Sequence, residues 1–461
     1  MTSSHGNSIS RRDWLRLSVA GALGLSGSGW FGGLANRASG AAGQGRKIKS
    51  CILLWMGGGP SQLETFDMKP DGPEESRGEL KPIATSVPGI QICEHLPKLA
   101  QQTGDLAILR SMSHNFPDHD RGPILMQTGF IRRPNLAHPH MGAVVSAEAD
   151  DPERGLPAFV SVGTVPGPGF LSPRHGPMIM GDPTKGTEDF KLATDTQKFG
   201  QRVELLQAQE EEFHKHLPAQ AVAAHRSAYL QATRLLNSNK LKAFDLAEEP
   251  VKVREAYGCN RPAPKGLGKR GSGEVKFGEG CLLARRLVEA GVPFVEVCHN
   301  RWDNHDYIFP SIQYHGAVID DSMSALIVDL KERGLLDSTL IIWMGEMGRT
   351  PKFQRGGTNG GPTVGRDHFT AAYTAVLAGG GLKTGQVIGR TSKDGSAVED
   401  RPISPPDFMA TVYKALGIDF TKEYNARDGK PIEAARQGSQ ANGAQPVRLV
   451  EKGEKPVEEL F

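Results

Sequence analysis

Short apolar runs, each followed by a polar segment, recur along most of the chain. Each run has the length and the β-branched or aliphatic composition of a buried strand. The runs lie at 51–56, 106–109, 157–162, 293–298, 339–344 and 373–378. Segments with a helical spacing of apolar residues lie at 281–290, 320–335 and 406–416. Strands that alternate with amphipathic helices predict an α/β fold with a mostly parallel sheet.

The composition of the chain changes in two places. Residues 187–257 are rich in Gln, Glu, Lys, Leu and Ala and contain few glycines, which predicts a helical insertion. Beyond residue 438 the chain is polar and charged, and we expect a poorly ordered tail. The predicted organisation is therefore one α/β domain over 46–435, with an insertion at about 187–257 and a polar tail at 438–461.

The N-terminus carries a twin-arginine box, Ser10-Arg11-Arg12-Asp13, followed by a weakly apolar stretch rich in Gly and Ala. An amphipathic first helix is the alternative, but the many glycines disfavour it. We therefore predict a twin-arginine signal peptide at 1–42, a partnership with the twin-arginine export machinery, and a mature chain that is periplasmic or secreted. No later run reaches the roughly 20 apolar residues of a membrane span, so we expect no transmembrane segment in the mature chain.

Charge and cysteine content narrow the function further. The chain has 461 residues, a formal net charge of +2 and no basic run, which argues against a nucleic-acid partner. Its five cysteines are scattered and form neither a zinc pattern nor a clear disulfide framework.

Residues suited to metal binding and catalysis follow four of the predicted strands. The carboxyl ends of parallel strands meet at one edge of a sheet, where ligands bind. Mixed histidine and carboxylate ligands suit a zinc-type ion. The candidates, in chain order, are Ser61, the group His114, Asp118, His119 and Asp120, the pair Asp303 and His305, and then Glu346, Arg349, Asp367 and His368.

Each candidate also has a simpler interpretation when it is taken alone. Ser61 is a suitable helix cap, Glu346 a partner for an ordinary salt bridge, and the stretch 114–120 a polar loop before a helix. The convergence of four strand ends favours one shared metal site over these alternatives.

Several motifs carry a resemblance to known families. The stretch 337–348, D-S-T-L-I-I-W-M-G-E-M-G, is similar to the sulfatase signature that supplies metal ligands. G-G-P-S, H-L-P-K-L-A, W-D-N-H, G-E-M-G-R-T-P and G-R-D-H-F resemble the hallmarks of the domain of unknown function 1501 family, exported bacterial sulfatase-like proteins. This resemblance implies an alkaline phosphatase-like, sulfatase-like three-layer sandwich with a mostly parallel central sheet.

The resemblance also implies roles for the candidate residues. Asp303, His305, Glu346 and His368 would hold one or two divalent ions, zinc or manganese, with Asp367 as a further ligand or as support for His368. His119 would act as a ligand or a general acid, Ser61 as a nucleophile and Arg349 as a clamp for a tetrahedral anion.

Two departures weaken the likeness to a sulfatase. Gly57 stands where those enzymes carry an aspartate, and His119 stands at the place of the nucleophile, without a C-x-P-S-R sequence. Either Ser61 or a water activated by the metal would then have to attack. The predicted function is metal-dependent hydrolysis of a small-molecule or glycan sulfate or phosphate ester in the cell envelope. The alternative is a non-catalytic sulfatase-like protein that binds a sulfated glycan or a partner protein.

Overall fold

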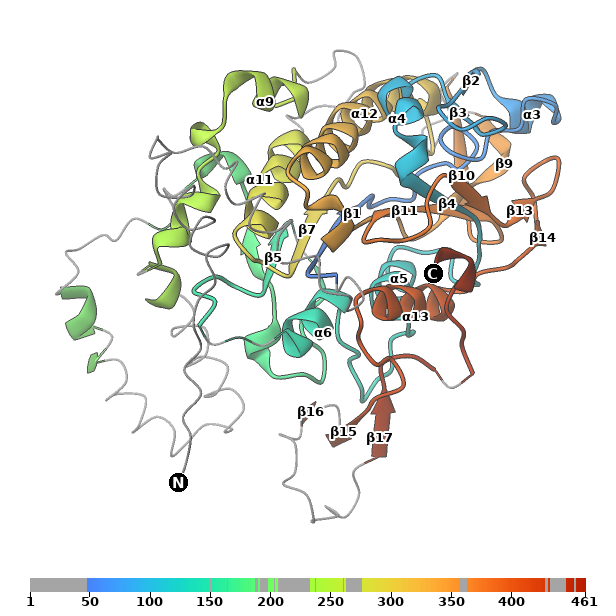
Figure 1. Ribbon diagram of the computed structural model, residues 1–461. Coiled ribbons are helices and arrows are strands. Elements are labelled where there is room, and N and C mark those ends of the chain that lie inside the picture. The colour runs from blue at the N-terminus through green and yellow to red at the C-terminus, as the bar shows by residue number, and fades with distance from the viewer. Residues whose placement is uncertain are drawn as a thin grey trace, which may run out of the picture. The chain divides into compact units, whose positions relative to one another are not determined.

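Eight strands form the central sheet of the protein, in the order β12-β4-β11-β8-β1-β7-β5-β6 (Figure 1). Their bounds are β1 Ser50–Trp55, β4 Leu106–Met112, β5 Phe159–Val162, β6 Met178–Met180, β7 Phe294–Cys298, β8 Thr339–Met344, β11 Tyr373–Gly379 and β12 Gln386–Ile388. The computed structural model describes residues 48–461 except 150, 152, 164, 187–189, 191–197, 203, 206–232, 237, 260, 263–275, 356–362, 428–429, 432–444 and 452.

The sheet is parallel apart from one strand. β1 pairs in parallel with both β7 and β8, whereas β11 runs antiparallel to its neighbours β8 and β4. The ends of β1, β4, β7 and β8 therefore point to the same edge, as expected from the sequence. The predicted α/β fold with a mostly parallel central sheet is confirmed.

Helices cover both faces of the sheet (Figure 1). One face packs α4 Pro97–Gln101, α11 Phe277–Glu289 and α12 Ile308–Glu332. The other face packs α5 Gly122–Thr128, α6 Met141–Glu148 and α13 Pro405–Ala415. Two further α-helices are α3 Glu74–Arg77 and α9 Val251–Ala256.

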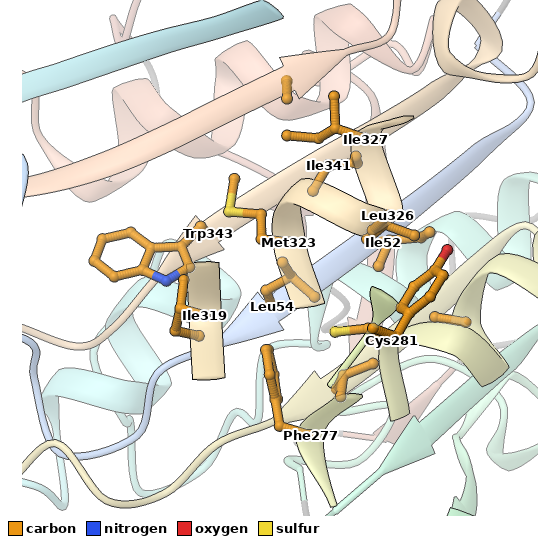
Figure 2. Packing of buried hydrophobic residues seen from close by; sticks show 14 of the residues in the cluster. Ile52, Leu54, Phe277, Cys281, Ile319, Met323, Leu326, Ile327, Ile341 and Trp343 are labelled. Atoms are coloured by element: carbon orange, nitrogen blue, oxygen red, sulfur yellow. The ribbon is translucent and has the colours of Figure 1, made fainter. Parts of the chain in front are cut away.

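Alternation along β1 sends its side chains into two separate cores. Ile52 and Leu54 join the cluster with α11 and α12, and Cys51 and Leu53 join the cluster with α6 and α13. This period of two is the geometry of any strand, and it makes β1 fully buried on both faces. Figure 2 shows Ile52, Leu54 and Trp343 packed against Met323 and other α12 side chains.

Smaller sheets surround the central one. They consist of the following strands: β2 Pro82–Ala84, β3 Gln91–Cys93, β9 Gly348–Arg355, β10 Val364–Phe369, β13 Arg390–Thr391, β14 Val398–Asp400, β15 Glu423–Arg427, β16 Lys430–Pro431 and β17 Gln445–Arg448. The antiparallel pair β9–β10 replaces most of the glycine-rich loop that the sequence predicted after residue 344. The glycines of that loop at 356, 357, 360 and 361 lie outside the described residues.

The C-terminal segment differs from the expected polar tail. Leu449, Val450, Val457 and Leu460 are buried and belong to the core that includes α13. The backbone N–H of Val457 donates to the hydroxyl of Thr411 in α13. Four apolar residues spaced through a charged stretch are enough to dock it on the domain.

Two predictions from the sequence concern residues that are largely undescribed. The signal peptide at 1–42 lies outside the described residues, as does most of the insertion at 187–257. Within the part of the chain that the structure describes, no helix is both long enough and apolar enough to cross a membrane.

Candidate metal centre

Three histidine side chains surround one carboxylate oxygen, Asp303 Oδ1. The Nε2 atoms of His305, His368 and His119 lie 2.9, 3.2 and 3.5 Å from it. Asp303 and His305 follow β7, His368 lies in β10, and His119 lies in the loop before α5. The structure thus brings together side chains from three separate parts of the chain at the carboxyl edge of the sheet.

The other ring nitrogen of two of these histidines faces an oxygen acceptor. His305 Nδ1 lies 3.1 Å from Gln354 Oε1, and His368 Nδ1 lies 3.0 Å from the carbonyl oxygen of Pro117. A carbonyl oxygen only accepts, so in each neutral ring the proton belongs on Nδ1 and the lone pair on Nε2. Both lone pairs then point toward Asp303 Oδ1, which is also an acceptor.

These acceptors are too close together to face one another without a cation. The two Nε2 atoms of His305 and His368 are 3.0 Å apart. Ligands that each lie about 2.1 Å from one ion are about 3.0 Å apart at a right angle and about 3.4 Å apart at the tetrahedral angle. The separations among Asp303 Oδ1, His305 Nε2 and His368 Nε2, which are 2.9, 3.2 and 3.0 Å, are close to this range, so these three groups fit a zinc-type ion or a shared proton. His119 Nε2 is farther away, 3.5 Å from Asp303 Oδ1.

Glu346 lies behind His119 rather than beside Asp303. Its Oε1 accepts from His119 Nδ1 at 2.7 Å and from the backbone N–H of Gly58 at 2.8 Å. This places Glu346 as the carboxylate that fixes the orientation of a ligating histidine and raises its basicity. The structure therefore gives Glu346 a position different from the direct ligand that the sequence suggested, and puts His119 in that place.

Electrostatic effects in the cluster favour charged groups. Hydrogen bonding to Asp303, and then to Glu346, raises the pKa of His119 to about 9, and the bond to Asp303 also raises the pKa of His305. Burial acts to raise the pKa of Asp303, but the three histidines and Arg349 outweigh it and hold that pKa well below its usual range. The cluster attracts positive charge, as either protons or a metal ion.

Arg349 is completely buried, which differs from the substrate clamp that the sequence suggested. Its guanidinium donates to Asp303 Oδ1 at 2.8 Å and to the carbonyl oxygens of Gly58, Gly59 and Arg366. Four hydrogen bonds within the protein leave little of its donor capacity for a ligand. Arg349 therefore orients and partly neutralises Asp303.

Ser61 is also enclosed. Only 2% of it is exposed, and its hydroxyl donates to the carboxylate of Glu64. Glu64 in turn pairs with the buried Arg366, at 2.6 Å, in a network that joins the loop after β1 to β10. This geometry fits a structural hydroxyl and offers no exposed nucleophile at Ser61.

The remaining candidates lie around the cluster. Asp367 is 61% exposed, with Oδ1 3.6 Å from His305 Nδ1, and its carboxylate accepts from the backbone N–H of His368. His114 Nε2 contacts the carbonyl oxygen of Glu346 at 2.7 Å, which fixes the loop before α5. Two further carboxylates of that loop, at positions 118 and 120, take no part in the described contacts around the histidines; the first pairs with Arg121.

Gln354 and the Pro117 carbonyl are the functional groups that the sequence analysis missed. Neither is of a type that draws attention, because amides and carbonyls are common in polar loops. Pro117 lies two residues before His119, within the stretch 114–120 that the sequence already indicated as a candidate for metal binding. Gln354 had no such signal, because its approach to His305 depends on the pairing of β9 with β10.

A family model described as "Protein of unknown function (DUF1501)" matches residues 48–443. The chain belongs to this family. A comparison with curated proteins gives no match.

Solved structures give similarities of low score. They include a sulfatase, PsFucS1 from Pseudoalteromonas sp., at 14% identity and TM-score 0.32, covering 84% of this chain and 71% of that one. The lipoteichoic acid synthase LtaP from Listeria monocytogenes has 8% identity, TM-score 0.34 and coverage of 84% and 79%. Alkaline phosphatase from the Antarctic bacterium TAB5 has 10% identity, TM-score 0.28 and coverage of 73% and 92%.

Proposed function

We propose that the protein binds a divalent ion, zinc or manganese, at Asp303, His119, His305 and His368, and hydrolyses a sulfate or phosphate ester. The observation that carries this proposal is the convergence of the Nε2 atoms of His305 and His368 on Asp303 Oδ1, at 2.9 and 3.2 Å. Three histidines and a carboxylate are ligands typical of zinc and related ions, whereas calcium takes oxygen ligands.

In this proposal the residues have separate tasks. Asp303 and the histidines hold the ion, Gln354 keeps His305 in the required tautomer, and Glu346 does the same for His119. A bound ion would supply Lewis acidity, polarising the ester oxygen and lowering the pKa of an attacking water. The exposed fractions of His119 and Asp303, 39% and 43%, leave this side of the cluster open to a substrate.

The second candidate is a binding protein without turnover. The burial of Ser61 and the full engagement of Arg349 favour it, because an exposed serine nucleophile and a free anion clamp are the usual aids to ester hydrolysis. Such a protein would hold a sulfated glycan or a partner protein at the same cluster, with the metal as part of the binding site.

A substrate panel separates the two candidates. Purified protein, after chelation and after reloading with zinc or manganese, is assayed with aryl sulfates, aryl phosphates and sulfated oligosaccharides. We expect turnover that disappears with the chelator, returns with the metal and is absent from His305→Ala. A metal-loaded, folded protein that hydrolyses none of these esters would leave only the binding candidate.

We also propose that the chain is exported through the twin-arginine machinery. The supporting observation is the Arg11-Arg12 pair in its polar and then glycine-rich context. Replacing both arginines with lysine should leave the protein in the cytoplasm, which fractionation and immunoblotting would detect. Unchanged export of the double variant would contradict the proposal.

A further inference from the structure

The loop after β1 reaches the cluster with its backbone. The peptide N–H of Gly58 donates to Glu346 Oε1 at 2.8 Å, and its carbonyl oxygen accepts from Arg349. Glu346 contacts His119 at 2.7 Å, and Arg349 contacts Asp303 at 2.8 Å. The backbone of one glycine is therefore linked to two of the proposed ligands, each through a single buried side chain.

No side chain fits at Gly58. Its φ of +108° is a conformation that other residues rarely adopt. A Cβ there would also lie within 3.0 Å of the backbone nitrogen of Asp303 and the carbonyl carbon of Trp302. The backbone N–H of Trp302 donates to the carbonyl oxygen of Gly57 at 3.1 Å, which holds the two loops together.

A second glycine makes an equally close approach from β10. A Cβ at Gly365 would overlap the carbonyl group of His305 and the backbone nitrogen of Asp306. Next to it, the N–H of Arg366 donates to the carbonyl oxygen of Asn304 at 3.1 Å. The same strand carries His368, so this contact joins the strand of His368 to the segment that carries His305.

We propose that Gly58 and Gly365 are positioning residues of the metal centre, holding the segment 303–305 between the loop after β1 and strand β10. Gly58 additionally orients His119 through Glu346 and Asp303 through Arg349. In this chain the loop after the first strand thus supplies backbone to the site one residue beyond Gly57, the position where the resembling enzymes carry an aspartate. The inference rests on the metal binding put forward under the proposed function.

Cobalt binding tests the inference without any assay of activity. Co²⁺ is titrated into the chelated full-length protein and its visible absorption, which reports coordination geometry, is recorded for wild type, Gly58→Ala and Gly365→Ala. The matched control is Gly104→Ala, because a Cβ at Gly104 meets no atom within 4 Å and its φ is ordinary. We expect both site variants to bind about 10–100-fold more weakly with altered bands, the range typical of residues that orient ligands, and the control to match wild type.

A third variant guards against loss of folding at the glycines. Glu346→Gln keeps the shape and an acceptor for the Gly58 N–H but removes the negative charge facing His119. It should keep the circular dichroism of wild type and weaken Co²⁺ by about tenfold or more. If one glycine variant fails to fold, the Co²⁺ affinities of Glu346→Gln and of the other glycine variant test the positioning role.

The outcomes separate the two proposals. Wild type that binds Co²⁺, with folded Gly58→Ala, Gly365→Ala and Glu346→Gln that bind it equally well and with the same bands, overturns the positioning role alone. Wild type that binds no Co²⁺ overturns the metal centre and, with it, the positioning role.

Discussion

Two groups of histidines in this protein have opposite surroundings. The cluster histidines, His119, His305 and His368, face Asp303 at the open edge of the sheet. Three enclosed histidines without a carboxylate partner, His138, His299 and His315, are buried within the domain. Burial lowers the pKa of His138 to about 4 and that of His315 to about 3, whereas Asp303 raises the pKa of His119 to about 9.

The enclosed histidines show what the same residue does without a carboxylate. His315 Nδ1 contacts His299 Nε2 at 3.1 Å, and the rings pack against Phe277 and Trp302. His138 stacks on Phe130 with 3.7 Å between ring centroids. Aromatic neighbours and desolvation keep these rings neutral, so the rings contribute to packing. In the cluster, by contrast, an acceptor contacts Nδ1 of each histidine, which leaves Nε2 to face a cation.

Removing the shared carboxylate should have the largest effect on the cluster. Asp303→Asn takes away the charge that all three histidines face, and we expect metal affinity to fall by more than about 100-fold, beyond the range for residues that only orient ligands. Asp367→Asn, a matched change at an exposed carboxylate, should cost about tenfold or less. Isothermal titration with Zn²⁺ measures both, and equal losses in the two variants would contradict the geometry.

The two histidine groups should respond oppositely to alanine. His305→Ala should strongly weaken metal binding with little change in stability. His315→Ala should leave the affinity for Zn²⁺ intact but lower the free energy of unfolding by about 1–3 kcal/mol, because it leaves His299 without its partner. Urea denaturation and metal titration of both variants test whether one change affects metal affinity and the other affects stability. A His315→Ala protein that loses the metal would contradict this expectation.

Acid should weaken the protein through an enclosed histidine. The unfolded chain binds a proton at His138 below about pH 6.5, and the native state resists this until about pH 4. Because the pKa of His138 is lower in the native state, the free energy of unfolding is unaffected by this residue above pH 6.5. It falls as the pH falls, by about 2 kcal/mol at pH 5. His138→Phe should flatten the change in urea midpoint between pH 7.5 and pH 5; an unchanged slope would contradict this account.

The smallest effect is expected at a carboxylate that the sequence places beside His119. Asp120 is exposed, and its backbone N–H donates to the neighbouring carboxylate at position 118. Asp120→Asn should therefore leave Zn²⁺ affinity unchanged in the same titration that registers Asp303→Asn. A large loss would mean that the loop rearranges around the metal.

Six strands of the central sheet could be predicted because each is a buried apolar run, such as the one ending at Met344. β6 and β12 were not predicted, because each has only three residues and is only partly buried. The hairpin β9–β10 could not be predicted, because its glycines and Pro351 are typical of loops. The C-terminal docking of Leu460 was missed for a related reason: isolated apolar residues in a charged stretch carry no periodic signal.

The residues that form the candidate site could be predicted from the sequence better than the role of each residue in it. Strand ends marked Asp303, His305 and His368 because parallel topology brings such ends together. Spacing along the chain carries no information on which carboxylate faces a metal and which faces a histidine, so Glu346 was expected to be a ligand although its carboxylate contacts His119. Burial of Arg349 was likewise invisible, because it depends on glycine carbonyls approaching its guanidinium.

Metal analysis of the purified protein tests the central claim most directly. Wild-type protein, dialysed against zinc and then against metal-free buffer, is analysed by inductively coupled plasma mass spectrometry beside His305→Ala and His315→Ala. The account predicts stoichiometric metal in wild type and in His315→Ala, and almost none in His305→Ala. Folded wild-type protein that retains no zinc, and none when the experiment is repeated with manganese, would contradict it.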